Sequence, residues 1–147
     1  PGGIPFDDKV TGQQWDFPNV WAPFQYYFIK LYENLAVQTG NFTWRERALH
    51  VGQRFLNSAF CGYKHYGQFF EKYNALKVGM PGGGGEYIVQ EGFGWTNGFL
   101  LWLLNRYGDQ LHVPVCQIGG GESPWTEQMP FGLDDRNRFQ SPHEWIH

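Results

Sequence analysis

Apolar residues recur at the spacing of an α-helix between residues 22 and 38. They occupy positions i, i+4, i+7 and i+11, which places them on one side of a helix: Phe24, Phe28, Leu31 and Leu35. Pro23 lies in the first turn, where a residue without an N–H loses no hydrogen bond. The pattern predicts a helix over Ala22–Gln38, ended by Thr39-Gly40.

Two further stretches show the same period. The second predicted helix opens with Thr43-Trp44-Arg45-Glu46, which matches a capping box. Its apolar row consists of Trp44, Ala48, Val51 and Phe55. The third helix runs from Thr96 to Tyr107, and Gly108 is placed to end it. No segment shows the alternation of a strand, so the sequence predicts an all-α fold whose helices are joined by long loops.

The composition indicates a folded protein with one core. The chain has 147 residues, of which 41% are hydrophobic, enough apolar surface to offset the loss of chain entropy. Aromatic residues make up 19%, with 7 Trp, 8 Tyr and 13 Phe. Such rings either pack in a core or lie against the apolar face of a sugar ring, and their number alone does not separate the two roles.

Charge and cysteine content exclude several classes of protein. The net charge is -3, and the 11 Lys and Arg residues are scattered, which argues against a nucleic-acid partner. No apolar run approaches the roughly 20 residues of a membrane span, so membrane attachment is not visible in this chain. Cys61 and Cys116 lack the spacing of a metal site but could form one bridge in an oxidising compartment. We expect no metal and no cofactor.

Four consecutive glycines, residues 82–85, lie in the long loop before the third helix and end at Glu86. A phosphate-binding loop would end in Gly-Lys-Ser/Thr, whereas the carboxylate of Glu86 would repel a phosphate. The run is therefore either a flexible surface linker or a mobile flap. As a flap it would bring Glu86 over a neutral ligand rich in hydroxyl groups, which carboxylates bind well.

Three other loop residues are candidates for chemistry. Glu71 follows Phe69-Phe70, and a carboxyl group that loses hydration among aromatic rings is suited to proton transfer near neutral pH. The alternative is a surface glutamate beside Lys72. Asp16 is either another candidate carboxyl group beside aromatic rings or a residue that caps a turn. Trp15 either stacks on a sugar ring or packs in the core. Glycoside hydrolysis uses two carboxyl groups, but the spacing does not select the pair.

The loop motifs resemble those of the trehalase family, glycoside hydrolase family 37. The string from Gln13 to Pro23, which contains Gln14-Trp15-Asp16-Phe17-Pro18-Asn19, is similar to the family's second signature. The next family blocks follow in order: Glu71-Lys72-Tyr73, Gly82-Gly83-Gly84-Gly85-Glu86-Tyr87 and Gly92-Phe93-Gly94-Trp95-Thr96-Asn97-Gly98. Pro1-Gly2-Gly3-Ile4-Pro5 and Asn105-Arg106-Tyr107-Gly108-Asp109 resemble animal trehalases in particular.

The resemblance implies a fold and a reaction. Residues 1–109 would form the C-terminal portion of an (α/α)6 barrel, followed by an irregular tail of unknown role over 110–147. The reaction implied is the inverting hydrolysis of α,α-trehalose to two glucose molecules. Glu71 maps to the general base of the family, Glu86 to a residue that contacts sugar hydroxyls and Trp15 to a residue that lines the sugar site. The glycine run would form a lid that excludes water.

Two positions depart from the family pattern. The family's general acid is an Asp in an upstream block of the type Ser-Gly-Trp-Asp, and no such block occurs in this chain. Asn74 stands where the family usually has Asp. We therefore expect a fragment that folds poorly alone and does not hydrolyse trehalose. The alternatives are a non-catalytic carbohydrate-binding or interaction protein derived from the trehalase scaffold and a helical hydrolase of another family.

The sequon Asn41-Phe42-Thr43 bears on localisation. It can accept an N-linked glycan only in a secreted protein, so it supports a secreted or cell-surface glycoprotein. Trehalose is the only partner that the sequence predicts.

Overall fold

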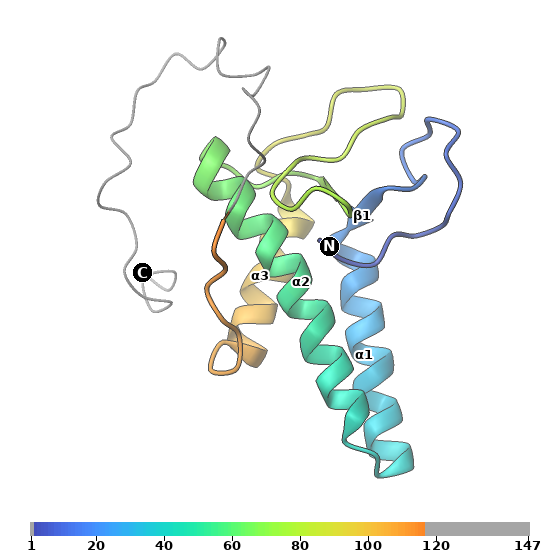
Figure 1. Cartoon of the computed structure of the whole chain (residues 1–147), viewed down its shortest axis with the longest axis vertical. Helices are drawn as coiled ribbons and strands as arrows, with labels where there is room; N and C mark the ends of the chain where they lie inside the picture. Colours follow the sequence, from blue (N-terminus) through green and yellow to red (C-terminus); the bar gives the residue numbers. More distant parts are fainter. Residues whose placement is uncertain (1, 117–147) are drawn as a thin grey trace.

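Three helices carry the fold, and a two-stranded sheet lies at one end of them (Figure 1). The computed structural model describes residues 2–116. The elements follow in the order β1 (Asn19–Trp21), α1 (Ala22–Thr39), α2 (Thr43–Tyr66), β2 (Lys72–Asn74) and α3 (Gly94–Tyr107). Helices α1 and α2 run antiparallel, and the long loops gather at the end where α1 begins and α2 ends. This arrangement brings the predicted motifs to one end of the molecule.

The three predicted helices are confirmed, but the predicted capping box is wrong. Thr43 is already the first helical residue, and no side chain caps α2 from its N-cap position, Phe42. Instead, the side chain of Asn41 accepts a hydrogen bond of 3.0 Å from the Thr43 N–H. Both α1 and α2 end at glycines with left-handed backbone, Gly40 and Gly67, as expected for residues that lack a Cβ.

The predicted apolar face of α1 is also wrong. The buried residues are Ala22, Gln25, Ile29 and Ala36, whereas Leu31 is 50% exposed. Gln25 explains the error, because its polar side chain interrupts the buried row in the sequence pattern. Its amide donates hydrogen bonds to the carbonyl oxygens of Ile4 and Trp21 and accepts one from the Ile4 N–H, so it is buried at no loss of hydrogen bonding.

The prediction of no strands was wrong for one small sheet. Strands β1 and β2 pair antiparallel with Asn19 opposite Asn74 and Trp21 opposite Lys72. Each strand has three residues, all of β1 is buried, and both faces of the sheet are covered. Strands this short show no alternation that a sequence pattern could reveal. The chain is therefore mostly helical rather than purely so.

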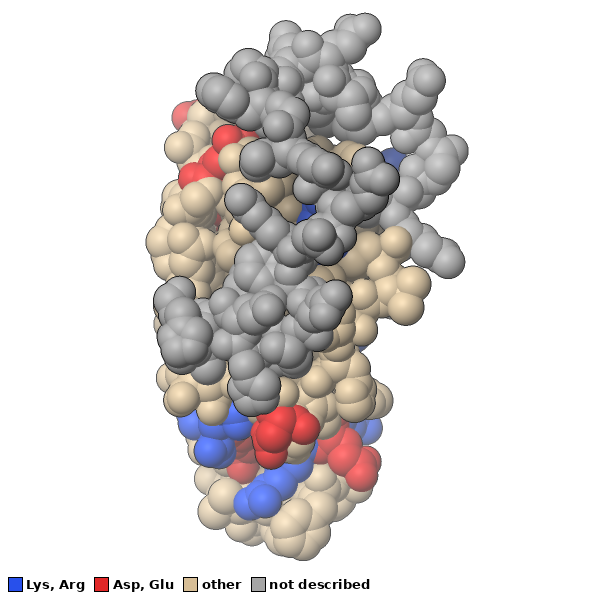
Figure 2. Space-filling model, turned by 90° about the vertical axis from the view of Figure 1, so that its left-hand side faces the viewer, with Lys and Arg blue, Asp and Glu red and all other residues tan. Residues whose placement is uncertain are grey.

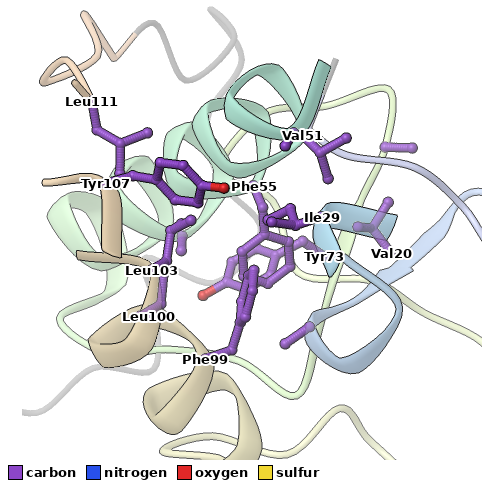
Figure 3. Close-up of a cluster of buried hydrophobic side chains, with 14 of the residues drawn as sticks. Val20, Ile29, Val51, Phe55, Tyr73, Phe99, Leu100, Leu103, Tyr107 and Leu111 are labelled. Atoms are coloured by element: carbon purple, nitrogen blue, oxygen red, sulfur yellow. The ribbon is translucent and has the colours of Figure 1, made fainter. Parts of the chain in front are cut away.

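The core joins the sheet to all three helices. Figure 3 shows side chains from every element pointing toward one another: Val20 of β1, Ile29 of α1, Phe55 of α2, Tyr73 of β2, and Phe99 and Leu103 of α3. Phe55 lies at the centre, with edge-to-face contacts to Tyr73 and Phe99 at centroid distances of 5.6 and 5.2 Å. Because Tyr73 is fully buried, β2 and the residues that precede it have a fixed position relative to the helices.

Residues 110–116 have no regular secondary structure but are attached to the core. Leu111 packs against it, and the side chain of Gln53 forms hydrogen bonds of 2.8 Å with both the backbone N–H and the carbonyl oxygen of His112. Cys116 is joined to Cys61 of α2 by a disulfide with a Cα–Cα distance of 5.3 Å. The remainder of the predicted tail, residues 117–147, lies outside the described residues.

Charges of both signs are interspersed on the face shown in Figure 2, near the end of the molecule where α1 turns into α2. Over residues 2–116, no helix combines the length and the apolar character needed to cross a membrane.

One partly buried carboxylate links α1 to α3. Glu33 accepts hydrogen bonds from the Lys30 ammonium at 2.6 Å, the Tyr107 hydroxyl at 2.6 Å and the Arg106 guanidinium at 3.0 Å. Burial alone would raise the pKa of Glu33. The three hydrogen bonds, that of Lys30 foremost, outweigh burial and lower the pKa to about 2.

We expect Glu33→Gln to lower the free energy of unfolding of the protein that contains this chain by roughly 1.5–3 kcal/mol at pH 7, the range for hydrogen bonds to charged groups. Because the folded pKa lies below the ordinary 4.5, this contribution is complete above about pH 5 and is lost as the pH falls toward 2. Urea unfolding of wild type and variant at several pH values measures the difference. The exposed Glu46→Gln serves as the control, and a wild-type advantage that does not shrink on acidification would contradict the assignment.

Candidate functional site

The backbone of Glu71 is fixed by the loop before α3 and by the start of that helix. Its N–H donates a hydrogen bond of 2.8 Å to the carbonyl oxygen of Gln90. Its own carbonyl oxygen accepts a hydrogen bond from the Trp95 indole N–H at 3.3 Å, and the Thr96 hydroxyl donates to the preceding carbonyl oxygen, that of Phe70, at 2.9 Å. The preceding residue, Phe70, forms an isolated antiparallel bridge with Glu91. The predicted site residue Glu71 therefore has a defined position.

The carboxyl group of Glu71 is buried and hydrogen-bonded through both oxygens. The residue is 2% exposed. Oε1 accepts a hydrogen bond of 3.1 Å from the Tyr87 hydroxyl, and Oε2 accepts one of 3.2 Å from the Gln90 N–H. Both donors lie in the loop that follows the glycine run. A carboxylate has about four acceptor positions, so two remain for a water or a ligand.

Lys72, the next residue, joins the two motif-bearing loops. It is 2% exposed, and its ammonium donates hydrogen bonds to the carbonyl oxygens of Gln14, Gly83 and Gly84 at 3.2, 3.0 and 3.1 Å. It also lies 5.1 Å from the centre of the Trp21 ring. Burial lowers the pKa of Lys72, and the nearby Glu71 carboxylate acts in the opposite direction. Three carbonyl partners match the three donors of an ammonium group.

Three of the four glycines, Gly82, Gly84 and Gly85, pack closely against residues 12–19, which explains why these positions carry no side chain. The side chain of Asn19 forms two hydrogen bonds of 2.9 Å with the backbone of Gly83. Its amide N–H donates to the Gly83 carbonyl oxygen, and its amide oxygen accepts from the Gly83 N–H. The Gly85 N–H donates to the carbonyl oxygen of Gly12 at 2.9 Å. A Cβ on Gly82 would lie 2.4 Å from the Asn19 side-chain oxygen, and one on Gly84 would lie 2.7 Å from the Gly12 oxygen. Gly84 also has a φ of +75°, which glycine adopts readily.

Trp15 is connected to Glu71 through a row of indole rings. It stacks on Trp21 at a centroid distance of 4.0 Å, and Trp21 meets Trp95 edge-to-face at 5.6 Å. Trp95 in turn bonds the Glu71 backbone. Glu86 is exposed, and its neighbour Tyr87 is the residue that contacts the Glu71 carboxylate. The structure thus places the three predicted site residues around the same pair of loops.

Asp16 and Asn74 have local structural roles. Asp16 accepts hydrogen bonds from the backbone N–H and hydroxyl of Thr11 and from the Gln13 N–H, so it shapes a turn, as one of the two sequence interpretations proposed. The Thr11 hydroxyl bond outweighs burial and lowers the pKa of Asp16. Asn74 accepts hydrogen bonds from the Leu76 and Lys77 N–H groups. The amide oxygen of Asn74 accepts these two hydrogen bonds as the carboxylate of the family's usual Asp would.

A cavity of about 530 Å³ lies beside the glycine run. It is lined by Phe70 with residues that precede it, and by Tyr87 with other residues of the loop before α3. Glu71 is not among the described residues that line this cavity, so the cavity is separate from the candidate site at the Glu71 carboxylate. Between residues 2 and 116, no group of three or more His, Cys, Asp or Glu side chains is arranged to bind a metal ion.

Comparison with known proteins decides the family. The family model described as Trehalase matches residues 1–108. The chain is 47% identical over 109 residues to the trehalase of Homo sapiens, 45% over 111 residues to that of Apis mellifera and 42% over 124 residues to that of Dictyostelium discoideum. The chain belongs to the trehalase family. These alignments cover 74%, 75% and 79% of the chain but only 18%, 17% and 20% of the relatives, so the chain spans about a fifth of their length.

The contacts of Lys72, Asn19 and Tyr87 were not apparent from the sequence of this trehalase-family chain. All three lie inside the motif strings, but their partners are up to 73 residues away. Only Lys72 carried a signal of its own. It is a single cation between aromatic residues, Phe69-Phe70 and Tyr73, and a buried cation needs hydrogen-bond partners.

Two neighbouring glycines of the run 82–85 provide a matched test of the packing. We expect Gly84→Ala to open the contact with Gly12, because a left-handed backbone costs a residue with a Cβ about 1–2 kcal/mol and the Cβ would also clash. Amide exchange at Gly85 should become at least about fivefold faster. At Gly83 a Cβ would meet no described atom within 4 Å, so Gly83→Ala should leave this exchange unchanged. Equal effects of the two substitutions would show that the loop does not pack here as described.

Proposed function

We propose that this chain supplies the part of a trehalase that carries the general base. The reaction is the hydrolysis of α,α-trehalose to two glucose molecules with inversion at the anomeric carbon. The observation that supports this most is the buried carboxylate of Glu71, hydrogen-bonded by Tyr87 and Gln90 between two loops with trehalase motifs. The human relative, 47% identical in the aligned region, is itself named a trehalase.

In the proposed reaction, Glu71 acts on a water molecule. The water oxygen bonds to the anomeric carbon from the face opposite the leaving glucose, and its proton passes to the Glu71 carboxylate. The glycosidic C–O bond breaks, and the leaving oxygen receives a proton from a general acid, which the family places in a block of the type Ser-Gly-Trp-Asp. Because Glu71 is closed off from bulk solvent, the attacking water must enter with the substrate.

Glu86 and Trp15 bind the sugar in this proposal. Glu86 is exposed at the end of the glycine run, where its carboxylate can accept hydrogen bonds from paired sugar hydroxyls. Trp15 offers an aromatic surface backed by Trp21. Residues 82–85 act as a lid whose closed position depends on Lys72 and Asn19.

The fold and the location of the whole protein follow from its family and from two features of this chain. The helices α1, α2 and α3 form a portion of an (α/α)6 barrel, and the chain alone does not hydrolyse trehalose because the general acid lies outside it. We also infer a secreted or cell-surface location. The Cys61–Cys116 disulfide is typical of an oxidising compartment, and the sequon residue Asn41 is exposed in the turn between α1 and α2.

In a trehalase that contains this chain, Glu71→Gln is expected to lower kcat by at least about 100-fold, the lower range for loss of a proton-transfer group. KM should change little, because glutamine keeps the shape and most hydrogen bonds. Steady-state kinetics with trehalose measures both, and Glu46→Gln is the control. If the variant kept more than half of the wild-type kcat, Glu71 would not be the base, and a role in carbohydrate binding alone would be favoured.

Glu86→Ala is expected to impair both KM and kcat, since lid closure binds the sugar and completes the site. In wild type, amide exchange across residues 79–90 should slow when a non-hydrolysable trehalose mimic binds. A solvated linker would behave differently: both constants would stay within about twofold, and exchange would not respond to the mimic. That result would remove Glu86 from the site.

A further inference from the structure

Three segments that are distant in the sequence meet at the hydroxyl group of Tyr87. The hydroxyl oxygen lies 3.1 Å from Oε1 of Glu71, which precedes β2, and 2.9 Å from the side-chain oxygen of Gln14, in the first loop. Tyr87 itself follows the glycine run by two residues. In the reaction proposed above, this hydroxyl group has no task of its own.

We propose that Tyr87 is a positioning residue that couples closure of the glycine loop to the orientation of the Glu71 carboxylate. The inference rests on the proposed function, in which Glu71 is the base. It assigns to the lid a second task besides excluding water: supplying the hydrogen bonds that fix the base.

The geometry of the two donors supports this assignment. The Tyr87 hydroxyl bonds Oε1 and the Gln90 N–H bonds Oε2, so rotation of the carboxylate about its Cγ–Cδ bond would break both hydrogen bonds. Both donors belong to the same loop, within three residues of each other. When this loop moves away, the carboxylate loses both at once.

The chemistry of the hydroxyl group favours Glu71 as its acceptor. A phenol has one proton, and of the two acceptors in reach the ionised carboxylate is stronger than the neutral amide oxygen of Gln14. Burial, followed by the hydrogen bond to Glu71, raises the pKa of Tyr87, so the phenol keeps the proton that it donates. Gln14 contacts the same oxygen and restricts the position of the ring relative to the first loop.

The backbone of the lid determines where Tyr87 lies. The Gly85 N–H bonds the Gly12 carbonyl oxygen at 2.9 Å, and Gly85 has a φ of +92°. An added Cβ there would lie 2.8 Å from the Gln14 Cβ. The same close packing that requires glycine therefore brings the Tyr87 ring to Gln14 and Glu71.

Tyr87→Phe tests the proposal in the complete enzyme, because it removes the hydroxyl group and keeps the ring. We expect kcat to fall by about tenfold, as for the loss of one hydrogen bond to a charged group, with KM within about twofold. Tyr27→Phe, at an exposed tyrosine of α1, is the control.

The double variant separates positioning from a general structural effect. If Tyr87 acts through Glu71, adding Tyr87→Phe to Glu71→Gln should cause no further loss of kcat. A Tyr87→Phe enzyme with unchanged kcat, or with losses that add fully to those of Glu71→Gln, would overturn the inference. Failure of the proposed function is distinguishable, because Glu71→Gln itself would then keep its activity.

Discussion

The structure depends on the hydrogen bonds of one buried ammonium group, that of Lys72. A buried charge is costly unless all its donors are satisfied, and here the partners are three backbone carbonyl oxygens from two loops. Gln14 and Gly83-Gly84 must both be in place for the charge to be accommodated. Loops that are about 70 residues apart in sequence are thereby brought to a common position beside Glu71.

The position of Lys72 is itself set by the helical core. Lys72 opens β2, and the next residue, Tyr73, is buried against Phe55 of α2. Adjacent residues in extended backbone point to opposite sides, so the same segment directs Lys72 toward the glycine run and Tyr73 into the core. On the α3 side, Trp95 bonds the carbonyl oxygen of Glu71, and Thr96 bonds that of Phe70. The catalytic proposal therefore rests on a carboxylate with support from α2, β2 and α3.

Features set by contacts between neighbouring residues could be predicted from the sequence, whereas features set by contacts between distant segments could not. The apolar period of α2 and α3 is local and identified both helices, and in α2 it also identified the buried residues Ala48, Val51 and Phe55. The face of α1 was missed because a polar residue, Gln25, occupies the buried row and satisfies its amide with loop backbone. The sheet was missed because three-residue strands buried on both sides have no alternation.

For the site, the family resemblance selected Glu71, Glu86 and Trp15, and composition alone could not. The positions of Lys72, Asn19 and Tyr87 in the motifs were visible, but their functions arise only from contacts across the fold. Glycines 82–85 illustrate the difference. The sequence left a flexible linker and a lid as alternatives, whereas the structure shows close packing against residues 12–14 that excludes side chains at Gly84 and Gly85.

The most direct test of the central claim is a crystal structure of the complete enzyme with a non-hydrolysable trehalose mimic. The account predicts that the loop 82–91 covers the ligand, that Tyr87 and Gln90 still bond the Glu71 carboxylate, and that a free Glu71 acceptor position lies within about 2.6–3.2 Å of a water at the anomeric carbon. A ligand bound away from Glu71, or a Glu71 carboxylate with no access to such a water, would contradict it.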